Sequence, residues 1–413
     1  MNGHILAIKA MTNHAERTVI NQLPASIWAL GFVSMLMDIS SEMVHSLLPM
    51  FLAGTLGISA LAIGFIEGLA ESTAMIVKVF SGSLSDWLGR RKMLALVGYT
   101  MGAFSKPLFA LATGGAMVVG ARFMDRVGKG IRGAPRDAMV ADIAPPNMRG
   151  AAFGLRQSLD TVGAFLGPLI ATGLMLLWAN DFRMVFWVAV IPGFLSVCVL
   201  AWAVKEPISY SEKKRINPFL KENLMKFDQN YWWVVGVGIF FALARFSEAF
   251  IVLRSYQLGI PMAFVPLVMV AMNLIYALTA YPFGKLSDRM NHSTLMAWGL
   301  VVLIASDFLL AWANDWSTVL LGVALWGVHM GMTQGLLSAM VANASPPDLR
   351  GTSFGIFNLV TGVAALISSI FAGWAWDDFG ASATFLFGSG FALICLVALL
   401  RMKKDFSLQV ANE

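Results

Sequence analysis

Residues 137–155 read DAMVADIAPPNMRGAAFGL and residues 338–356 read SAMVANASPPDLRGTSFGI, with ten identities in nineteen aligned positions. A shorter pair, GSLSD at 82–86 and GKLSD at 284–288, is separated by nearly the same stretch of chain. Repeats at one offset indicate that a structural unit has been duplicated. We therefore expect two halves of similar fold.

The composition is that of an integral membrane protein. Of 413 residues, 58% are hydrophobic and 13% are charged, and the mean hydropathy is +0.71. Apolar runs of about twenty residues are long enough to cross a hydrocarbon core about 30 Å thick. They predict an all-α membrane protein with twelve transmembrane helices, at 26–52, 60–81, 93–113, 116–141, 151–178, 184–204, 231–255, 260–282, 294–313, 316–341, 353–375 and 381–401.

The basic residues outside these runs fall almost entirely on one side. The termini and alternate loops hold eighteen lysines and arginines, whereas the opposite loops hold only Arg183. Because cytoplasmic loops retain Lys and Arg, both termini are predicted to be cytoplasmic, and in a bacterium the membrane would be the inner one. The net charge of +5 follows from this topology and does not indicate nucleic-acid binding.

The longest polar stretch, residues 205–230, stands between the sixth and seventh predicted helices. We interpret it as a cytoplasmic linker between an N-terminal six-helix half, residues 1–204, and a C-terminal six-helix half, residues 231–413. Two halves related by duplication are typical of secondary transporters, whose substrate site lies between the halves near the membrane midplane.

Several sequence features resemble those of a known family. GSLSDWLGRRK, residues 82–92, resembles the signature loop of the major facilitator superfamily, and GKLSDRM at 284–290 matches it more weakly. Arg122 occupies the place of the superfamily's arginine in helix four. The resemblance covers essentially the whole chain. It implies helices one, four, seven and ten around a central cavity, and transport by alternating access of the two halves.

Helix five carries the spacing G-x8-G-x3-G-P that is associated with antiporters, at Gly154, Gly163, Gly167 and Pro168. Ala171 and Thr172 stand where that motif usually ends in two glycines. Missing side chains let helices approach closely, and proline can bend a helix. The resemblance implies gating by Gly163, Gly167 and Pro168, while ordinary glycine-mediated packing would use the same residues.

The signature loop is predicted to form a cytoplasmic gate. Gly82 is expected where two helices approach closely. The resemblance implies that Asp86 and Arg90 join Asp142 in a charge cluster that locks the halves in one orientation. The alternative, a basic anchor on the cytoplasmic side, explains Arg90 but not Asp86.

Charge is concentrated in GARFMDRVGKGIRGAPRDAM, residues 120–139. A charged residue costs about 2.5–3.5 kcal/mol at the bilayer centre on insertion scales, so it pairs, faces water or binds a charged substrate. Three- and four-residue spacing places five bases on one broad helix face: Arg122, Arg126, Lys129, Arg132 and Arg136. We predict that Arg126, Lys129 and Arg132 bind anionic groups. The alternative is a salt-bridge network, because nine acids nearly balance the ten bases inside predicted helices.

Two further helices offer candidate site residues. In helix one, Asp38 and Glu42 are four residues apart and share a face with His45. Partly shielded carboxyl groups exchange protons, so Asp38 and Glu42, together with Arg122, are predicted to couple protons. The alternative role is as counter-ions to helix four. In helix seven, Arg245 and Glu248 have the spacing of an intrahelical pair and are predicted to bind substrate.

Several function classes lack their motifs. The chain has no phosphate-binding loop, no paired-cysteine metal spacing and no HExxH or GxSxG sequence, so we expect no enzyme, metal or cofactor. We predict a monomeric secondary transporter that exports a small organic solute in exchange for protons. One alternative is proton-coupled uptake of an anionic solute, such as an organic acid, phosphate ester or metal chelate. Another is a membrane sensor or an intramembrane enzyme.

Overall fold

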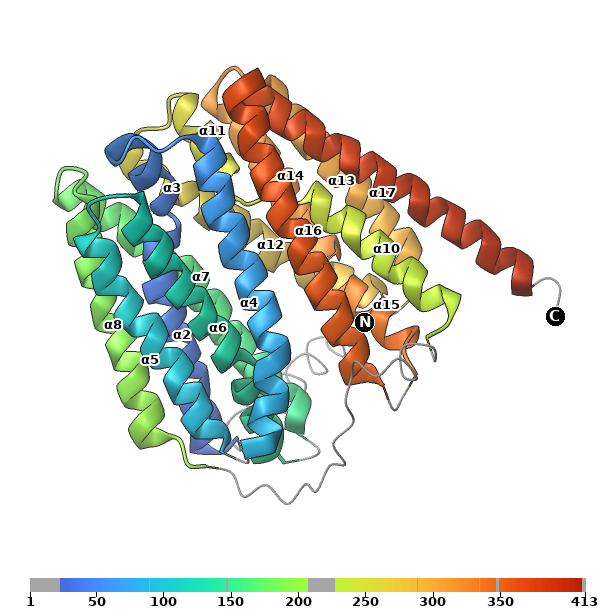
Figure 1. The fold of residues 1–413 in the computed structure, drawn as a ribbon, viewed down its shortest axis with the longest axis horizontal. Coiled ribbons are helices and arrows are strands. Elements are labelled where there is room, and N and C mark those ends of the chain that lie inside the picture. Colours follow the sequence, from blue (N-terminus) through green and yellow to red (C-terminus); the bar gives the residue numbers. More distant parts are fainter. Residues whose placement is uncertain are drawn as a thin grey trace, which may run out of the picture.

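The protein is described by a computed structural model that covers residues 23–410 apart from 89, 146–147, 207–226, 288, 334 and 347–348. The side chains of 83, 86, 350, 351 and 402–410 also lie outside this description. Helices account for nearly all of it, and they run roughly alongside one another in one bundle (Figure 1).

The helices follow the predicted apolar runs. Those before the expected linker are α2 (Ala25–His45), α3 (Leu48–Met50), a π-helical turn η1 (Phe51–Thr55), α4 (Ala60–Leu88), α5 (Arg91–Leu111), α6 (Gly115–Ile143), α7 (Arg149–Leu177) and α8 (Phe182–Ala203). Those after it are α10 (Gln229–Ala244), α11 (Ala249–Gln257), the 3-10 turn η3 (Met262–Phe264), α12 (Pro266–Ser287), α13 (His292–Trp312), α14 (Trp316–Thr333), α15 (Leu336–Asn343), α16 (Arg350–Phe379) and α17 (Ala381–Val410). Most of the expected linker, residues 207–226, lies outside the described residues.

Short polar side chains mark where several helices begin. Asp181 accepts hydrogen bonds from the backbone N–H groups of Arg183 and Met184 at the start of α8. Asp228 and Asn291 cap α10 and α13 in the same way. Such caps satisfy N–H groups that have no partner within the helix. These three caps thus mark where their helices begin, at the edge of an apolar run.

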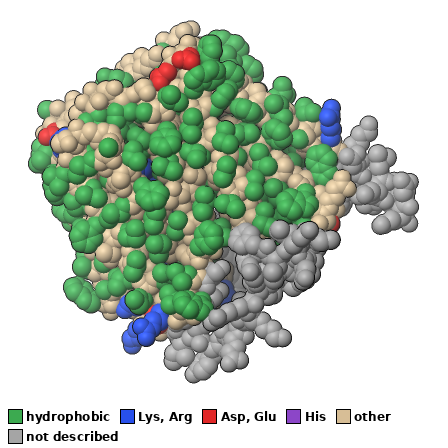
Figure 2. Space-filling view, in the orientation of Figure 1, with side chains coloured by type: hydrophobic (Ala, Val, Ile, Leu, Met, Phe, Trp, Pro, Cys, Tyr) green, Lys and Arg blue, Asp and Glu red, His purple; other side chains and the backbone are tan. Residues whose placement is uncertain are grey.

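Eleven helical spans in the described part of the chain are long and apolar enough to cross a membrane. The twelfth expected span is α6, whose charged residues lower its hydropathy. It nevertheless packs along α4 and α5 inside the N-terminal half. The outside of the bundle is apolar: Figure 2 shows hydrophobic side chains over most of the visible face. Trp202 is 85% exposed and Tyr281 78%, as a lipid-facing surface requires.

In the C-terminal half, two spans predicted as continuous helices are broken well inside the span. The prediction for residues 231–255 was wrong in this respect, because α10 ends at Ala244 and α11 begins only at Ala249. Likewise, residues 316–341 form α14 and α15, separated at Gly335, where φ is +85°. Glycine adopts this left-handed conformation without a Cβ clash. Residues 245–248 contain neither glycine nor proline, so no local signal marked that break.

Helices α2 and α7 approach closely at two glycines of the predicted motif. A Cβ added at Gly163 would lie 2.7 Å from the carbonyl oxygen of Met35, and one at Gly167 would lie 2.7 Å from the Glu42 Cβ atom. Pro168 is buried within α7, which continues past it. The two glycines therefore set the distance between these helices.

Gly167→Val is expected to lower the stability of the folded protein by about 1–3 kcal/mol, because overpacking forces the helices apart. The midpoint of unfolding in detergent would measure this effect. Gly173→Val is the matched control, since Gly173 lies on the same helix with no atom within 4 Å of an added Cβ. Equal midpoints for the two variants would contradict the assigned contact.

Candidate functional site

A cavity of about 590 Å³ lies between the two halves. Its walls come from α2, α4, α6 and α7 on one side and from α10, α12, α14, α15 and α16 on the other. Eight titratable side chains line it: Glu42, His45, Glu67, Glu71, Arg126, Lys129, Arg245 and Glu248. Six of these belong to the N-terminal half, so charge is concentrated on that wall.

The wall from the C-terminal half is mainly apolar and neutral. Aromatic and methionine side chains there include Phe241, Phe246, Phe357, Met269 and Met330. Neutral polar side chains lie among them: Ser247, Asn273, Thr333, Ser338, Asn358, Thr361 and Ser369. Hydroxyl groups can hydrogen-bond within their own helix, as Thr333 does to His329 and Thr361 to Phe357, and none of these neutral residues was among the predicted site residues. This wall suits the apolar body of a solute with a few hydrogen-bonding groups.

Three bases of the N-terminal half are engaged in buried ion pairs. The Arg122 Nη2 atom donates to the Glu67 Oε2 atom at 2.5 Å. Arg126 contacts Glu71 at 3.1 Å and Asp125 at 3.3 Å. Asp125 also accepts from the Lys106 Nζ atom at 2.7 Å.

The predicted salt-bridge alternative therefore describes these bases well. Arg122, Arg126 and Lys106 are at most 2% exposed. Such burial requires a counter-charge, because an unpaired ion in a low-dielectric interior is costly.

Lys129 differs from these neighbours. It is exposed and lines the cavity. Among the described side chains, no acid lies within ion-pair distance of its ammonium group. Lys129 is thus a cation on the N-terminal wall whose charge is available to a solute.

Arg132 lies on another side of α6. Its guanidinium sits 5.0 Å from the centre of the Tyr99 ring on α5, and the residue is buried outside the cavity lining. Helical geometry places it about 120° around the helix from Arg126. Arg136 also points away from the cavity, toward Asp137 and the hydroxyl of Ser34. The bases predicted to share one face of α6 are therefore split: Arg126 and Lys129 line the cavity, whereas Arg132 and Arg136 lie inside the N-terminal half.

The predicted proton-coupling residues are not all brought together. Glu42 lines the cavity, and the His45 Nδ1 and Nε2 atoms lie 3.5 Å from Glu42 and 3.5 Å from Glu67, respectively. Glu67 in turn pairs with Arg122. Asp38 instead packs at the α2–α7 contact beside Gly163, outside the cavity lining. His45 therefore joins two carboxylates of different helices, a role that sequence spacing did not predict.

Arg245 and Glu248 both line the cavity, but not as an intrahelical pair. They flank the break between α10 and α11, Arg245 directly after Ala244 and Glu248 directly before Ala249. Within the described residues, the two charges form no ion pair, and the Arg245 Nε atom has no hydrogen-bond partner. The expected pairing is corrected: unwinding separates groups that a continuous helix would align.

The predicted charge cluster of the gate is not found as expected among the described side chains. Asp142 on α6 is paired with Arg91 of α5, whereas Arg90 is exposed. This ion pair lies within the N-terminal half. The side chain of Asp86 lies outside the described residues. A Cβ added at Gly82 would meet Ala134 at an ordinary 3.5 Å, while one at Gly130 would lie 2.6 Å from Val77. The close approach of α4 and α6 is therefore at Gly130.

Two groups of membrane-spanning helices around a central charged cavity define a solute transporter. The sequence model of the Major Facilitator Superfamily matches residues 30–253 and 234–410. The chain therefore belongs to the major facilitator superfamily, a family of transporters and not of enzymes. This result confirms the predicted fold class of two six-helix halves.

Three similar proteins illustrate the range of relatives. An "uncharacterized MFS-type transporter" of Methanocaldococcus jannaschii is 31% identical, with 92% of this chain and 95% of that protein covered. The multidrug resistance protein MdtH of Photorhabdus laumondii is 24% identical, with 84% and 86% covered. The crystal structure of a POT family transporter in complex with 5-aminolevulinic acid superposes with a TM-score of 0.76 at 12% identity, covering 92% and 98%. The last similarity concerns the fold alone.

Proposed function

We propose that this transporter exports a small amphipathic organic anion in exchange for protons. The observation that carries the proposal is the pair of cavity cations without an ion-pair partner among the described residues, Lys129 on one half and Arg245 on the other. A solute carboxylate or phosphate would supply the missing counter-charge. Phe241, Phe246 and Phe357 would hold its apolar part.

The other predicted substrate residues take supporting roles in this proposal. Glu71 and Asp125 neutralise Arg126, so Arg126 shapes the wall and contributes less charge to a solute. Arg132 stabilises α5 against α6 from outside the cavity. Glu248, on the same cavity wall as Arg245, would select against solutes with a second anionic group near it, because like charges repel.

Proton exchange is assigned to Glu42 at the cavity, with His45 and Glu67 forming a chain of titratable groups behind it. The ion pair between Arg122 and Glu67 would weaken when a proton reaches Glu67, which would link Arg122 to proton exchange. Asp38, at the α2–α7 contact, would act as a second proton site when the helices shift. Export is favoured over uptake by the similarity to MdtH and by the glycine spacing of α7.

A panel of organic anions in reconstituted vesicles with an imposed pH gradient tests coupling and direction together. Antiport predicts that solute moves opposite to the protons and that collapse of the gradient by an ionophore stops accumulation. Movement of solute with the protons would support the second candidate, anion uptake, which the cationic cavity also allows. Solute movement independent of the gradient would refute proton coupling.

We further propose that the protein acts as a monomer in a cytoplasmic membrane with both termini in the cytoplasm. The excess of Lys and Arg in the termini and alternate loops supports this orientation.

A further inference from the structure

The two halves meet along α4 and α16, which lie side by side (Figure 1). We call the end of the bundle near Ala60 and Phe379 the distal end, because it lies opposite the end where α8 stops and α10 starts. Near the distal end the backbones touch. A Cβ added at Gly64 would clash with the carbonyl oxygen of Ser369, and one at Gly373 would clash with that of Ala60.

The contact between α4 and α16 changes toward the opposite end. There a Cβ added at Gly362 would meet the side chain of Met75 at 3.4 Å, and one at Gly355 would meet that of Val79 at 3.1 Å. Side chains thus replace backbone as the points of contact, and the two ribbons diverge in Figure 1. The halves are packed most closely at the distal end.

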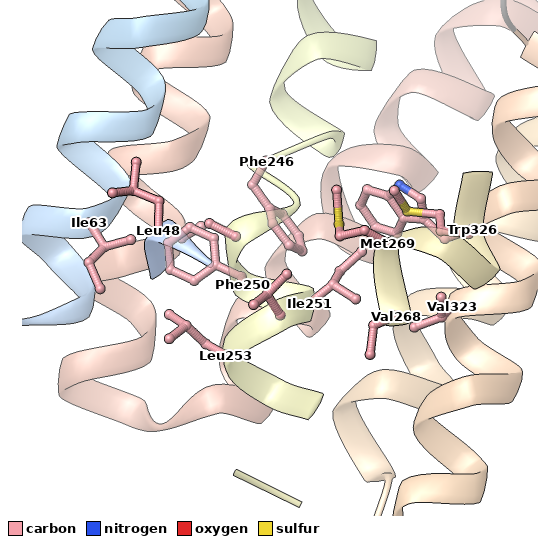
Figure 3. Packing of buried hydrophobic residues seen from close by; sticks show 14 of the residues in the cluster. Leu48, Ile63, Phe246, Phe250, Ile251, Leu253, Val268, Met269, Val323 and Trp326 are labelled. Atoms are coloured by element: carbon pink, nitrogen blue, oxygen red, sulfur yellow. The ribbon is translucent and has the colours of Figure 1, made fainter. Parts of the chain in front are cut away.

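An apolar cluster seals the same end. Leu48 and Ile63 from the N-terminal half pack near Phe250 and Leu253 of α11 (Figure 3). The Phe250 ring lies 5.8 Å from the ring of Trp376 on α16. These four side chains, Leu48, Ile63, Phe250 and Leu253, are each at most 7% exposed. Solute in the cavity therefore meets a closed wall on this side.

One polar contact crosses this closed end. The Asp377 carboxylate of α16 accepts hydrogen bonds from the backbone N–H groups of Ala60, at 3.1 Å, and Leu61, at 2.8 Å. These are the first residues of α4. The next N–H group, that of Ala62, donates to the Ser59 hydroxyl of the same half. Two of the N–H groups that begin α4 are thus satisfied by the other half of the protein.

We propose that Asp377 is a latch that holds the distal end closed during the transport cycle. The carboxylate complements the partial positive charge at the start of α4 and supplies acceptors for N–H groups that have none within the helix. Opening the cavity at the distal end separates α4 from α16 and breaks both hydrogen bonds. Asp377 therefore shifts the equilibrium between the two cavity orientations toward the distal-closed one, whatever solute is carried.

The latch is tested by measuring distal opening directly. Spin labels would be placed at Thr113 and Asn314, exposed residues of the α5–α6 and α13–α14 loops, after replacement of Cys198 and Cys395 by alanine. Pulsed electron spin resonance in lipid nanodiscs gives the distribution of distances between the labels. Asp377→Ala should raise the ratio of open to closed populations about fivefold, the factor that corresponds to the ~1 kcal/mol typical of a lost helix cap.

The neighbouring acid is a matched control. Asp378 is exposed on the same helix, and its carboxylate makes no hydrogen bond or ion pair with the described residues, so Asp378→Ala should leave the distance distribution unchanged. Asp377→Asn keeps an acceptor oxygen and should give an intermediate shift. This variant still tests the contact if the alanine variant does not fold. An unchanged distribution in both Asp377 variants, or an equal shift in Asp378→Ala, would overturn the latch. No solute is needed, so failure here is distinguishable from failure of the proposed anion export.

Discussion

Asp125→Asn is expected to lower the free energy of unfolding by about 3–5 kcal/mol, the range measured when one partner of a buried ion pair is removed. The Asp125 carboxylate contacts Lys106 at 2.7 Å and Arg126 at 3.3 Å, and it also accepts from the Ser105 hydroxyl at 3.3 Å. All four residues are buried. An amide in its place keeps the shape but leaves two buried cations with less counter-charge.

The measurement is the unfolding equilibrium in mixed micelles, followed by tryptophan fluorescence. Asp142→Asn is the surface control: its ion pair with Arg91 is partly exposed, so its loss should cost at most about 1 kcal/mol. Adding Lys106→Met to Asp125→Asn removes one of the stranded cations and should recover part of the loss. If Asp125→Asn and Asp142→Asn were equally mild, the buried network would not support the N-terminal half.

Lys129→Gln is expected to weaken solute binding about 10–100-fold while leaving stability unchanged. A hydrogen bond to a charged group contributes about 1.5–3 kcal/mol, and substitution of Lys129 strands no buried acid, since it forms no ion pair within the described residues. The test is the KM, in vesicles, for the solute that the transport panel identifies, together with the unfolding midpoint of the same preparation. Arg245→Gln should raise the KM similarly from the opposite wall.

Lys78→Gln is the matched control for Lys129. Lys78 is another exposed lysine of the N-terminal half, on α4, and it does not line the cavity. Its substitution should leave the KM unchanged. Parallel loss of binding and of folded protein in Lys129→Gln would instead place Lys129 in the structural ion-pair network and would remove the main support for an anionic solute.

The helices and the duplication were predictable because their signals are local. Spanning a bilayer requires about twenty apolar residues in a row, and eleven spans meet that requirement in the described residues. The twelfth, α6, was found in spite of its charges because apolar residues fill its other positions. The repeat at 137–155 and 338–356 needed only a comparison of the chain with itself.

The charges of the site were predictable as a group but not one by one. Their cost in a membrane marked the bases of α6, Glu42 of α2, and Arg245 with Glu248 as candidates. Five of the eight titratable residues that line the cavity were predicted as site residues: Glu42, Arg126, Lys129, Arg245 and Glu248. His45 was noticed only for sharing a face with Asp38. Its contact with Glu67 joins α2 to α4, and spacing along a single helix does not predict a contact between two helices.

The sequence by itself determined that this is a duplicated, twelve-helix membrane protein with an excess of charge in one half, because hydropathy and repetition are properties of successive residues. Only the tertiary structure decided which bases are neutralised and which remain available. Arg122 and Arg126 meet acids of α4, Arg132 faces Tyr99 on α5, and Lys129 faces the cavity. Residues three or four apart share a broad face, but the helix packed against each part of that face sets the partner of every side chain.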